Sequence, residues 1–277
     1  MTGASGFIGS TLVDRLLELG EYEVYAGVRG SSNRKYLQNP NIRFIEVEFS
    51  NPEKLKTQFE NEKFDCIFHL AGLTKANRLT DFDRVNFELT KNLVDAIDTN
   101  ITKLIFLSSF AAHGPGEEVN FTQSKVSDEN KPNTAYGRSK LKAENYINEN
   151  FKGKYVILRP TGVYGPRETD YFVFFQTIDN HIEPYLGFVP QRLTFVYSKD
   201  LVQVCIKAFE SEVSGKTYFV SDGKMYLDSE YAAISKQILN KKTLKLKFPL
   251  FIVKWISSFL DMLGRAIGTQ FTLNKDK

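Results

Sequence analysis

A tyrosine and a lysine four residues apart are the side chains in this sequence best suited to proton transfer. Tyr136 and Lys140 stand in the stretch Tyr-Gly-Arg-Ser-Lys, at the start of a segment with helical spacing. Residues four apart share one helix face, so the ammonium would lie one turn from the phenol and favour the phenolate. A tyrosine with an ordinary pKa of about 10 would then act as acid or base near neutral pH. The same spacing also fits a partly buried tyrosine beside a solvated lysine.

Glycines at the start of the chain are typical of a turn that binds a pyrophosphate. Gly3, Gly6 and Gly9 are three residues apart and precede an amphipathic helical stretch. Gly3 would permit a tight turn, Gly6 would let the backbone approach the phosphates, and Gly9 would let the helix pack closely on a sheet. The amides and the positive dipole end of that helix would face the anion. Glycines also serve turns that bind nothing, so the motif needs support from the rest of the chain.

In their order along the chain, the motifs resemble the short-chain dehydrogenase/reductase superfamily, in its extended branch, the NAD-dependent epimerase/dehydratase family. The resemblance covers nearly the whole chain. Beyond the glycine turn and the Tyr-x-x-x-Lys pair, it rests on residues 69–72, 85–90, 104–109, 159–167 and 195–201. It implies an α/β fold, a doubly wound parallel Rossmann sheet with a smaller C-terminal substrate-binding lobe. It also implies an NAD(P)-dependent oxidoreductase that moves a hydride between nicotinamide and a carbinol or carbonyl carbon.

The resemblance implies roles for a Ser-Tyr-Lys set. Tyr136 would exchange a proton with the substrate oxygen and Ser109 would hydrogen-bond that oxygen. Lys140 would hold the nicotinamide ribose while lowering the pKa of the tyrosine. Ser108 is the alternative hydroxyl, but the spacing from Ser109 to the next glycine fits the family better. Asn86 would steady the helix beneath the site, although an ordinary helix asparagine fits equally well.

The end of the second strand in the family pattern bears on the cofactor. NAD-specific sites carry a carboxylate there for the ribose 2′-hydroxyl, whereas residues 28–35 read Val-Arg-Gly-Ser-Ser-Asn-Arg-Lys. Arg29 would stack on the adenine or pair with a 2′-phosphate, and Arg34 would add a contact. An exposed basic loop is the other interpretation. We therefore expect NADP, with NAD left open. The residues expected at the cofactor are Gly3, Ser5, Gly6, Phe7, Ile8, Gly9, Arg29, Arg34, Glu48, Phe49, Leu70, Ala71, Gly72, Thr74, Tyr136, Lys140, Pro160 and Val163.

Residues near Ser109 and two arginines bear on the substrate. The family's sugar 4,6-dehydratases follow the catalytic hydroxyl with Asp-Glu, and Phe110 and Ala111 stand in those places, so we do not expect dehydration. The motif at residues 159–167 is closest to hydroxysteroid and dihydroflavonol-type reductases. Arg167 and Arg192 could clamp a nucleotide diphosphate, which keeps a UDP-sugar 4-epimerase as the alternative; ordinary surface arginines are the other interpretation.

A non-catalytic NAD(P)-binding sensor or scaffold is a third hypothesis. Family members of that kind usually lose the tyrosine or the lysine. Ser109, Tyr136 and Lys140 are all retained in this chain, which argues for an enzyme.

Apolar runs alternate with helix-length segments, which predicts a parallel sheet. Strands are expected near residues 23–28, 43–48, 66–70, 104–108 and 155–158. We expect a Rossmann domain in residues 1–165, with 194–210 returning to it, and a substrate-binding lobe in 166–193 and 211–277. The family pattern has a complete strand before the glycine turn, where this sequence has Met1 and Thr2, so we expect that first strand to be missing. The end at residues 274–277 also comes early for the family.

Composition fits this class of enzyme. The 277 residues are 42% hydrophobic and 25% charged, enough for a large α/β domain with a smaller appendage. A net charge of +3 gives no reason to expect nucleic acid. Cys66 and Cys205 lie in apolar runs and are typical of reduced thiols in a cytoplasmic protein. We expect a small-molecule substrate, no metal and no transmembrane segment, and leave a homodimer open.

Overall fold

The computed structural model describes residues 1–116, 122–252 and 255, and its chain divides into two compact units. The first unit contains Met1–Thr161 and Tyr197–Val220, and the second contains Gly162–Val196 and Ser221–Lys277. Each unit is described by itself below.

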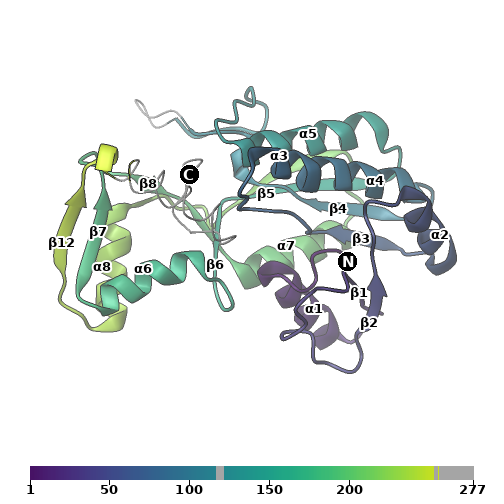
Figure 1. The fold of residues 1–277 in the computed structure, drawn as a ribbon, viewed down its shortest axis with the longest axis horizontal. Helices are drawn as coiled ribbons and strands as arrows, with labels where there is room; N and C mark the ends of the chain where they lie inside the picture. Colours follow the sequence, from purple (N-terminus) through teal and green to yellow (C-terminus); the bar gives the residue numbers. More distant parts are fainter. Residues whose placement is uncertain (117–121, 253–254, 256–277) are drawn as a thin grey trace. The chain divides into compact units, whose positions relative to one another are not determined.

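Parallel strands form the centre of the first unit (Figure 1). A four-stranded sheet has the order β10-β5-β4-β3, and β1 pairs in parallel with β2. The strands are β1 (Tyr25–Val28), β2 (Arg43–Glu46), β3 (Cys66–His69), β4 (Lys103–Leu107), β5 (Tyr155–Pro160) and β10 (Lys216–Val220). Thr2 forms parallel bridges to Gly27 of β1 and to His69 of β3. At the position between β1 and β3, the structure thus has a bridge of one residue.

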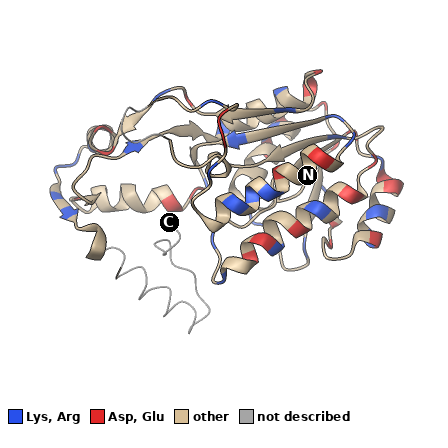
Figure 2. Cartoon of the chain, turned by 90° about the horizontal axis from the view of Figure 1, so that it is seen from above, with Lys and Arg blue, Asp and Glu red and all other residues tan. Residues whose placement is uncertain are grey.

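Helices cover both faces of these strands. In Figure 1, α2, α4 and α5 lie on one side, and α1 and α7 lie on the other. The helical elements are α1 (Phe7–Leu19), α2 (Pro52–Glu62), α3 (Leu79–Phe82), the π-helix η1 (Asp83–Glu88), α4 (Leu89–Ala96), the 3-10 helix η2 (Phe110–Ala112), α5 (Ala135–Asn150) and α7 (Ser198–Glu210). Charges of both signs are interspersed along them (Figure 2). The expected doubly wound α/β fold is confirmed.

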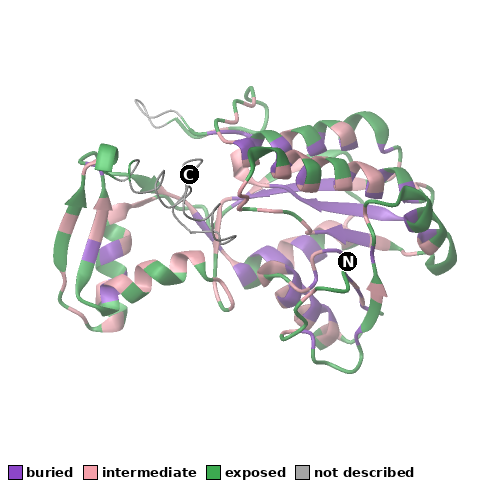
Figure 3. Cartoon of the chain, in the orientation of Figure 1, coloured by how far each residue is buried: buried purple, intermediate pink, exposed green. Residues whose placement is uncertain are grey.

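The core of the first unit lies where β4 is covered on both faces. Every residue of β4 is buried, as expected for a continuous apolar strand inside a parallel sheet (Figure 3). Phe106 and Leu104 of this strand pack with Leu93 of α4 and Ile147 of α5. Because this packing holds β4 in place, the residues that follow Leu107 have a defined position.

The second unit combines short strands with two helices. Its elements are β6 (Gly162–Tyr164), α6 (Asp170–Asp179), β7 (Ile182–Leu186), β8 (Arg192–Leu193), β9 (Phe195–Tyr197), β11 (Tyr226–Leu227), α8 (Asp228–Leu239) and β12 (Leu244–Phe248). Strands β7 and β12 pair in parallel, and β8 pairs antiparallel with β11. The Tyr231 ring stacks on Phe174 and Phe195, with centroids 4.8 and 5.0 Å apart, and this aromatic cluster forms the centre of the unit.

The expected domain division differs from the structure in two ways. Residues 162–165 and 194–196, which we assigned to the Rossmann domain, belong to the second unit. We assigned residues 211–277 to the lobe, but β10 pairs in parallel with β5 in the main sheet. Residues 216–220 alternate exposed and more buried positions, and no local pattern distinguishes a strand of one sheet from a strand of another. The strands expected from apolar runs are all present, as β1 to β5. The C-terminal residues 274–277 lie outside the described residues. Within the described part of the chain, no helix is both long and apolar enough to cross a membrane.

Candidate active site

The glycine turn connects Thr2 to α1 and leaves the first helix amides open. Gly6 is the N-cap of α1, and its amide donates to the Gly3 carbonyl at 3.0 Å. Gly3 has a φ of 69°, which favours glycine. A Cβ on Gly9 would lie 2.1 Å from the Gly3 oxygen, whereas a Cβ on Gly6 would approach that atom only to 3.3 Å. Gly3 and Gly9 are therefore required by the turn itself, and exposed Gly6 is not.

The loop after β3 packs on this turn and is fastened to α5. A Cβ on Gly3 would lie 2.7 Å from the Ala71 amide nitrogen, so the two loops are in direct contact. Buried Asn86 of η1 accepts from the Leu73 amide at 2.7 Å and donates to the Leu73 carbonyl at 2.9 Å. Its amide also donates to Ser139 Oγ of α5 at 3.0 Å. Asn86 thus joins the loop to the helix that carries the tyrosine and the lysine.

Ser109 and Tyr136 come together where η2 meets the start of α5. Ser109 follows β4, and its Oγ accepts from the Ala111 amide at 3.2 Å. A Cβ on Gly137 would lie 2.2 Å from the Ala111 carbonyl oxygen, so only glycine allows the helix to approach so closely. Tyr136, the preceding residue, is hydrogen-bonded to Ser109. The predicted serine and tyrosine thus form one hydrogen-bonded pair.

Lys140 is buried one helical turn beyond Tyr136. Its Nζ donates to the Leu107 carbonyl at 2.9 Å and lies 4.9 Å from the centroid of the Phe106 ring. The Nζ lies 3.2 Å from the position of a Cβ on Gly72, which brings the loop after β3 beside the ammonium. Burial lowers the pKa of Lys140 to about 8, and the negative charge of Glu144 opposes that shift.

The pKa of Tyr136 differs from our expectation. We predicted that the Lys140 ammonium would lower it, but burial raises the pKa of Tyr136, and the hydrogen bond with Ser109 opposes this only in part. The reason is that removal of the phenol from water disfavours the phenolate, while the ammonium is directed to the Leu107 carbonyl of β4.

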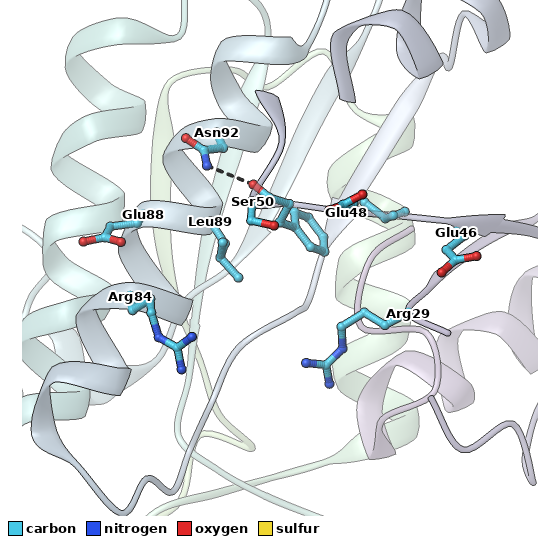
Figure 4. A pocket seen from close by; sticks show the side chains of 10 residues that line it. Arg29, Glu46, Glu48, Ser50, Arg84, Glu88, Leu89 and Asn92 are labelled. Carbon is cyan, nitrogen blue, oxygen red and sulfur yellow. Dashed lines mark hydrogen bonds between the residues drawn. The ribbon is translucent and has the colours of Figure 1, made fainter. Parts of the chain in front are cut away.

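A pocket of about 470 Å³ lies beyond the ends of β1 and β2 (Figure 4). Three of the predicted residues, Arg29, Glu48 and Phe49, line it. Figure 4 shows Arg29 and Arg84 on opposite sides, with both guanidinium groups turned toward the space between them. Arg34 is not among the residues that line this pocket, because its guanidinium lies over the Phe44 ring, 4.5 Å from the centroid.

One wall of this pocket was missed by the sequence analysis. It comes from η1 and α4 and includes Arg84, Glu88 and Asn92. These residues are four apart along a continuous helical segment after β3, and that spacing was the signal that could have found them. Asn92 Nδ2 donates to the Phe49 carbonyl at 2.9 Å and so joins this wall to the segment after β2.

The remaining predicted residues lie in both units. In the first unit, Ser5, Phe7 and Ile8 lie in the glycine turn and the first turn of α1, Leu70 and Thr74 in the loop after β3, and Pro160 at the end of β5. Phe110 and Ala111 begin η2 directly after Ser109. Val163, Arg167 and Arg192 belong to the second unit. There, Arg192 Nη1 lies 3.9 Å from Met225 Sδ.

Comparison with known proteins identifies the family of this chain. Residues 1–221 match the NAD dependent epimerase/dehydratase family. The chain belongs to this family. Its members are extended short-chain dehydrogenase/reductase enzymes, so the predicted family, enzyme class and Rossmann fold are confirmed.

Two relatives with similar sequences are named for different reactions. A UDP-glucose 4-epimerase of Vibrio cholerae is 27% identical over 285 residues, covering 97% of this chain and 85% of that protein. A 3-beta-hydroxysteroid dehydrogenase of Mycolicibacterium neoaurum is 27% identical over 252 residues, covering 84% of this chain and 67% of that protein. Equal identity to an epimerase and to a dehydrogenase means that sequence similarity alone does not choose between the two reactions.

A solved structure has the same fold as this chain. A UDP-glucose 4-epimerase of Thermotoga maritima, determined with UDP-glucose, has a TM-score of 0.78 at 23% identity and covers 90% of this chain and 84% of that one. At this identity the likeness concerns the fold.

Proposed function

We propose that this enzyme is an NADP-dependent reductase of a carbonyl compound, with Ser109, Tyr136 and Lys140 as its catalytic residues. The observation that carries the proposal is the hydrogen-bonded pair of Ser109 and Tyr136, one helical turn from the buried Lys140. Phe110 and Ala111 directly follow the serine and carry no carboxylate for an elimination. These features support oxidation and reduction at a carbon that bears oxygen.

The described residues fit a nicotinamide dinucleotide. The open N-terminus of α1, with exposed Gly6 as its N-cap, suits a pyrophosphate. The pocket lined by Arg29 and Phe49 suits the adenosine end. Lys140 and Gly72 would lie at the nicotinamide ribose. When bound, the reduced nicotinamide supplies a hydride to the substrate carbon.

The side chains of this enzyme suit the reductive direction. Because burial raises the pKa of Tyr136, the phenol keeps its proton at neutral pH. A protonated tyrosine is the state needed to donate to the oxygen of a carbonyl group under reduction. Ser109 would hydrogen-bond the same oxygen and hold it beside the phenol. Lys140 would act at the nicotinamide ribose, since its ammonium donates to the Leu107 carbonyl.

Arg29 is the basis for proposing NADP rather than NAD. Its side chain enters the pocket at the place where NAD-specific members of such folds carry a carboxylate. We expect Arg29→Asp to weaken NADP binding by about 1–3 kcal/mol, the scale of a lost charged hydrogen bond, and to weaken NAD binding much less. Fluorescence titration of both cofactors measures the two effects.

Arg34→Asp is the matched control for Arg29→Asp. It makes the same charge change in the same loop, but Arg34 is stacked on Phe44 outside the pocket lining. We expect a smaller loss of NADP affinity from this variant. Equal losses of NAD and NADP affinity in Arg29→Asp would contradict a contact with the 2′-phosphate.

A UDP-sugar 4-epimerase is the second candidate, favoured by similarity to the Vibrio cholerae enzyme over 97% of this chain. That reaction needs a grip on the nucleotide diphosphate, for which Arg167 and Arg192 are the candidates. We expect calorimetry to detect no UDP binding to this enzyme, and we expect NADPH oxidation with at least one hydrophobic aldehyde or ketone.

The arginine variants decide between the two candidates if UDP does bind. Micromolar UDP affinity that disappears in Arg167→Ala would favour the epimerase over the reductase. Arg15→Ala is the control, because Arg15 pairs with Glu18 on α1 in the first unit and should not affect UDP.

A further inference from the structure

A buried ion pair lies next to the catalytic residues in the first unit. Glu144 of α5 and Arg159 of β5 are 1% and 3% exposed. Arg159 Nε lies 3.0 and 3.1 Å from the two carboxylate oxygens, and Nη2 lies 2.5 Å from Oε2. The same carboxylate accepts a hydrogen bond from Ser108 Oγ. None of these contacts is part of the mechanism above.

The contacts of Glu144 lead directly to Lys140. Glu144 follows Lys140 by one helical turn on α5. Ser108, which it binds, follows Leu107, whose carbonyl accepts the hydrogen bond from Lys140 Nζ. The Glu144 carboxylate therefore links α5, which carries Lys140, to the end of β4, where the Leu107 carbonyl accepts from the Lys140 ammonium.

The other end of the pair extends the network to η2. Arg159 Nη1 donates to Asn130 Oδ1 at 2.9 Å, and Asn130 Oδ1 also lies 3.2 Å from His113 Nδ1. The His113 ring lies against Phe110 of η2, with centroids 5.5 Å apart. The network thus includes elements on both sides of Ser109.

Stability alone does not explain a buried ion pair. Replacing such a pair by apolar side chains of similar volume is often neutral or stabilising, because both charges lose their hydration on burial. Three titratable side chains surround Lys140. They are Tyr136 and Glu144 on its own helix and His69 on β3. His69 is neutral, since burial and the charge of Lys140 lower its pKa to about 3. Glu144 is therefore the negative charge that acts on the ammonium, while β4 contributes the Leu107 carbonyl and the Phe106 ring.

We propose that Glu144, held by Arg159, is a positioning residue for Lys140: it fixes the end of β4 through Ser108 and supplies the negative charge one helical turn from the ammonium. The proposal gives the buried ion pair a part in catalysis through Lys140 and rests on the proposed role of that lysine. Without the carboxylate, the ammonium would lose its proton at lower pH and would be neutral in a larger fraction of molecules at neutral pH.

The test measures the titration of Lys140 itself, without any substrate. The enzyme is prepared with 13C-labelled lysine, the Lys140 Cε signal is assigned with Lys140→Arg, and its chemical shift is followed against pH. We expect Glu144→Gln, which keeps the shape and removes the charge, to move the Lys140 midpoint down by about one pH unit or more. Glu149→Gln, an exposed position on the same helix, should leave the midpoint unchanged.

A second variant keeps the test decisive if Glu144→Gln fails to fold. Glu144→Gln with Arg159→Gln removes both buried charges, and of the two it is Glu144 that lies on the helix of Lys140, one turn away. The midpoint should again fall. An unchanged midpoint in the folded variants would overturn the proposal, because a purely structural ion pair would not move it. A shifted midpoint in an enzyme that reduces no carbonyl compound would support the role of Glu144 while contradicting the proposed reaction.

Discussion

Tyr136→Phe should lower turnover by about 10²–10⁴-fold, the usual contribution of a general acid or base. The substitution deletes the proton donor and keeps the ring, which packs edge-on against Phe82 at 6.1 Å between centroids. Cofactor affinity should stay within a few-fold, since the phenol is expected to act on the substrate oxygen. Steady-state kinetics with NADPH and an identified carbonyl substrate, together with a cofactor titration, measure both quantities.

Tyr146→Phe is the matched control on the same helix. It also removes a hydroxyl, one that donates to Asp95 at 2.6 Å away from the catalytic pair. Its turnover should remain close to that of the parent enzyme. Near-normal turnover in Tyr136→Phe would mean that another group carries the proton.

Gly9→Ala and Gly6→Ala should both weaken cofactor binding, but only Gly9→Ala should also lower the stability of the fold. A Cβ on Gly9 would meet backbone atoms of Gly3 and Ala4 at 2.1 to 2.9 Å, and backbone has little freedom to move away. We expect Gly9→Ala to lose about 1–3 kcal/mol of unfolding free energy or more, as overpacked sites do, and to lose cofactor binding with the turn. Chemical denaturation measures the stability.

Gly6→Ala isolates the role of the turn as a phosphate site. Its Cβ would have room, with the Gly3 oxygen at 3.3 Å, and its φ of −78° suits alanine. The variant should therefore fold with nearly unchanged stability. Its cofactor affinity should fall at least tenfold, roughly 1.4 kcal/mol, if the pyrophosphate approaches this backbone. Unchanged affinity would place the phosphates elsewhere.

Local patterns in the sequence predicted the fold class correctly and selected the catalytic candidates. Apolar runs alternating with helical segments predict parallel strands because each run must be buried on both faces, and β4 is buried throughout. Glycine spacing predicts the turn before α1, since positive φ at Gly3 and the space at Gly9 are backbone requirements. Helical spacing likewise predicts that Tyr136 and Lys140 are one turn apart.

Only the tertiary structure decided which distant residues act on these candidates. Asn86 and Ser139 are far apart in sequence, and their hydrogen bond exists because η1 packs on α5. The placement of β10 in the main sheet is a non-local pairing that no short segment encodes. Burial also reversed the expected direction of the Tyr136 pKa, because solvation depends on everything that surrounds the phenol. The carboxylate of Glu144 likewise becomes a partner of Ser108 and Arg159 only when the fold brings α5 beside β5 and the residue that follows β4.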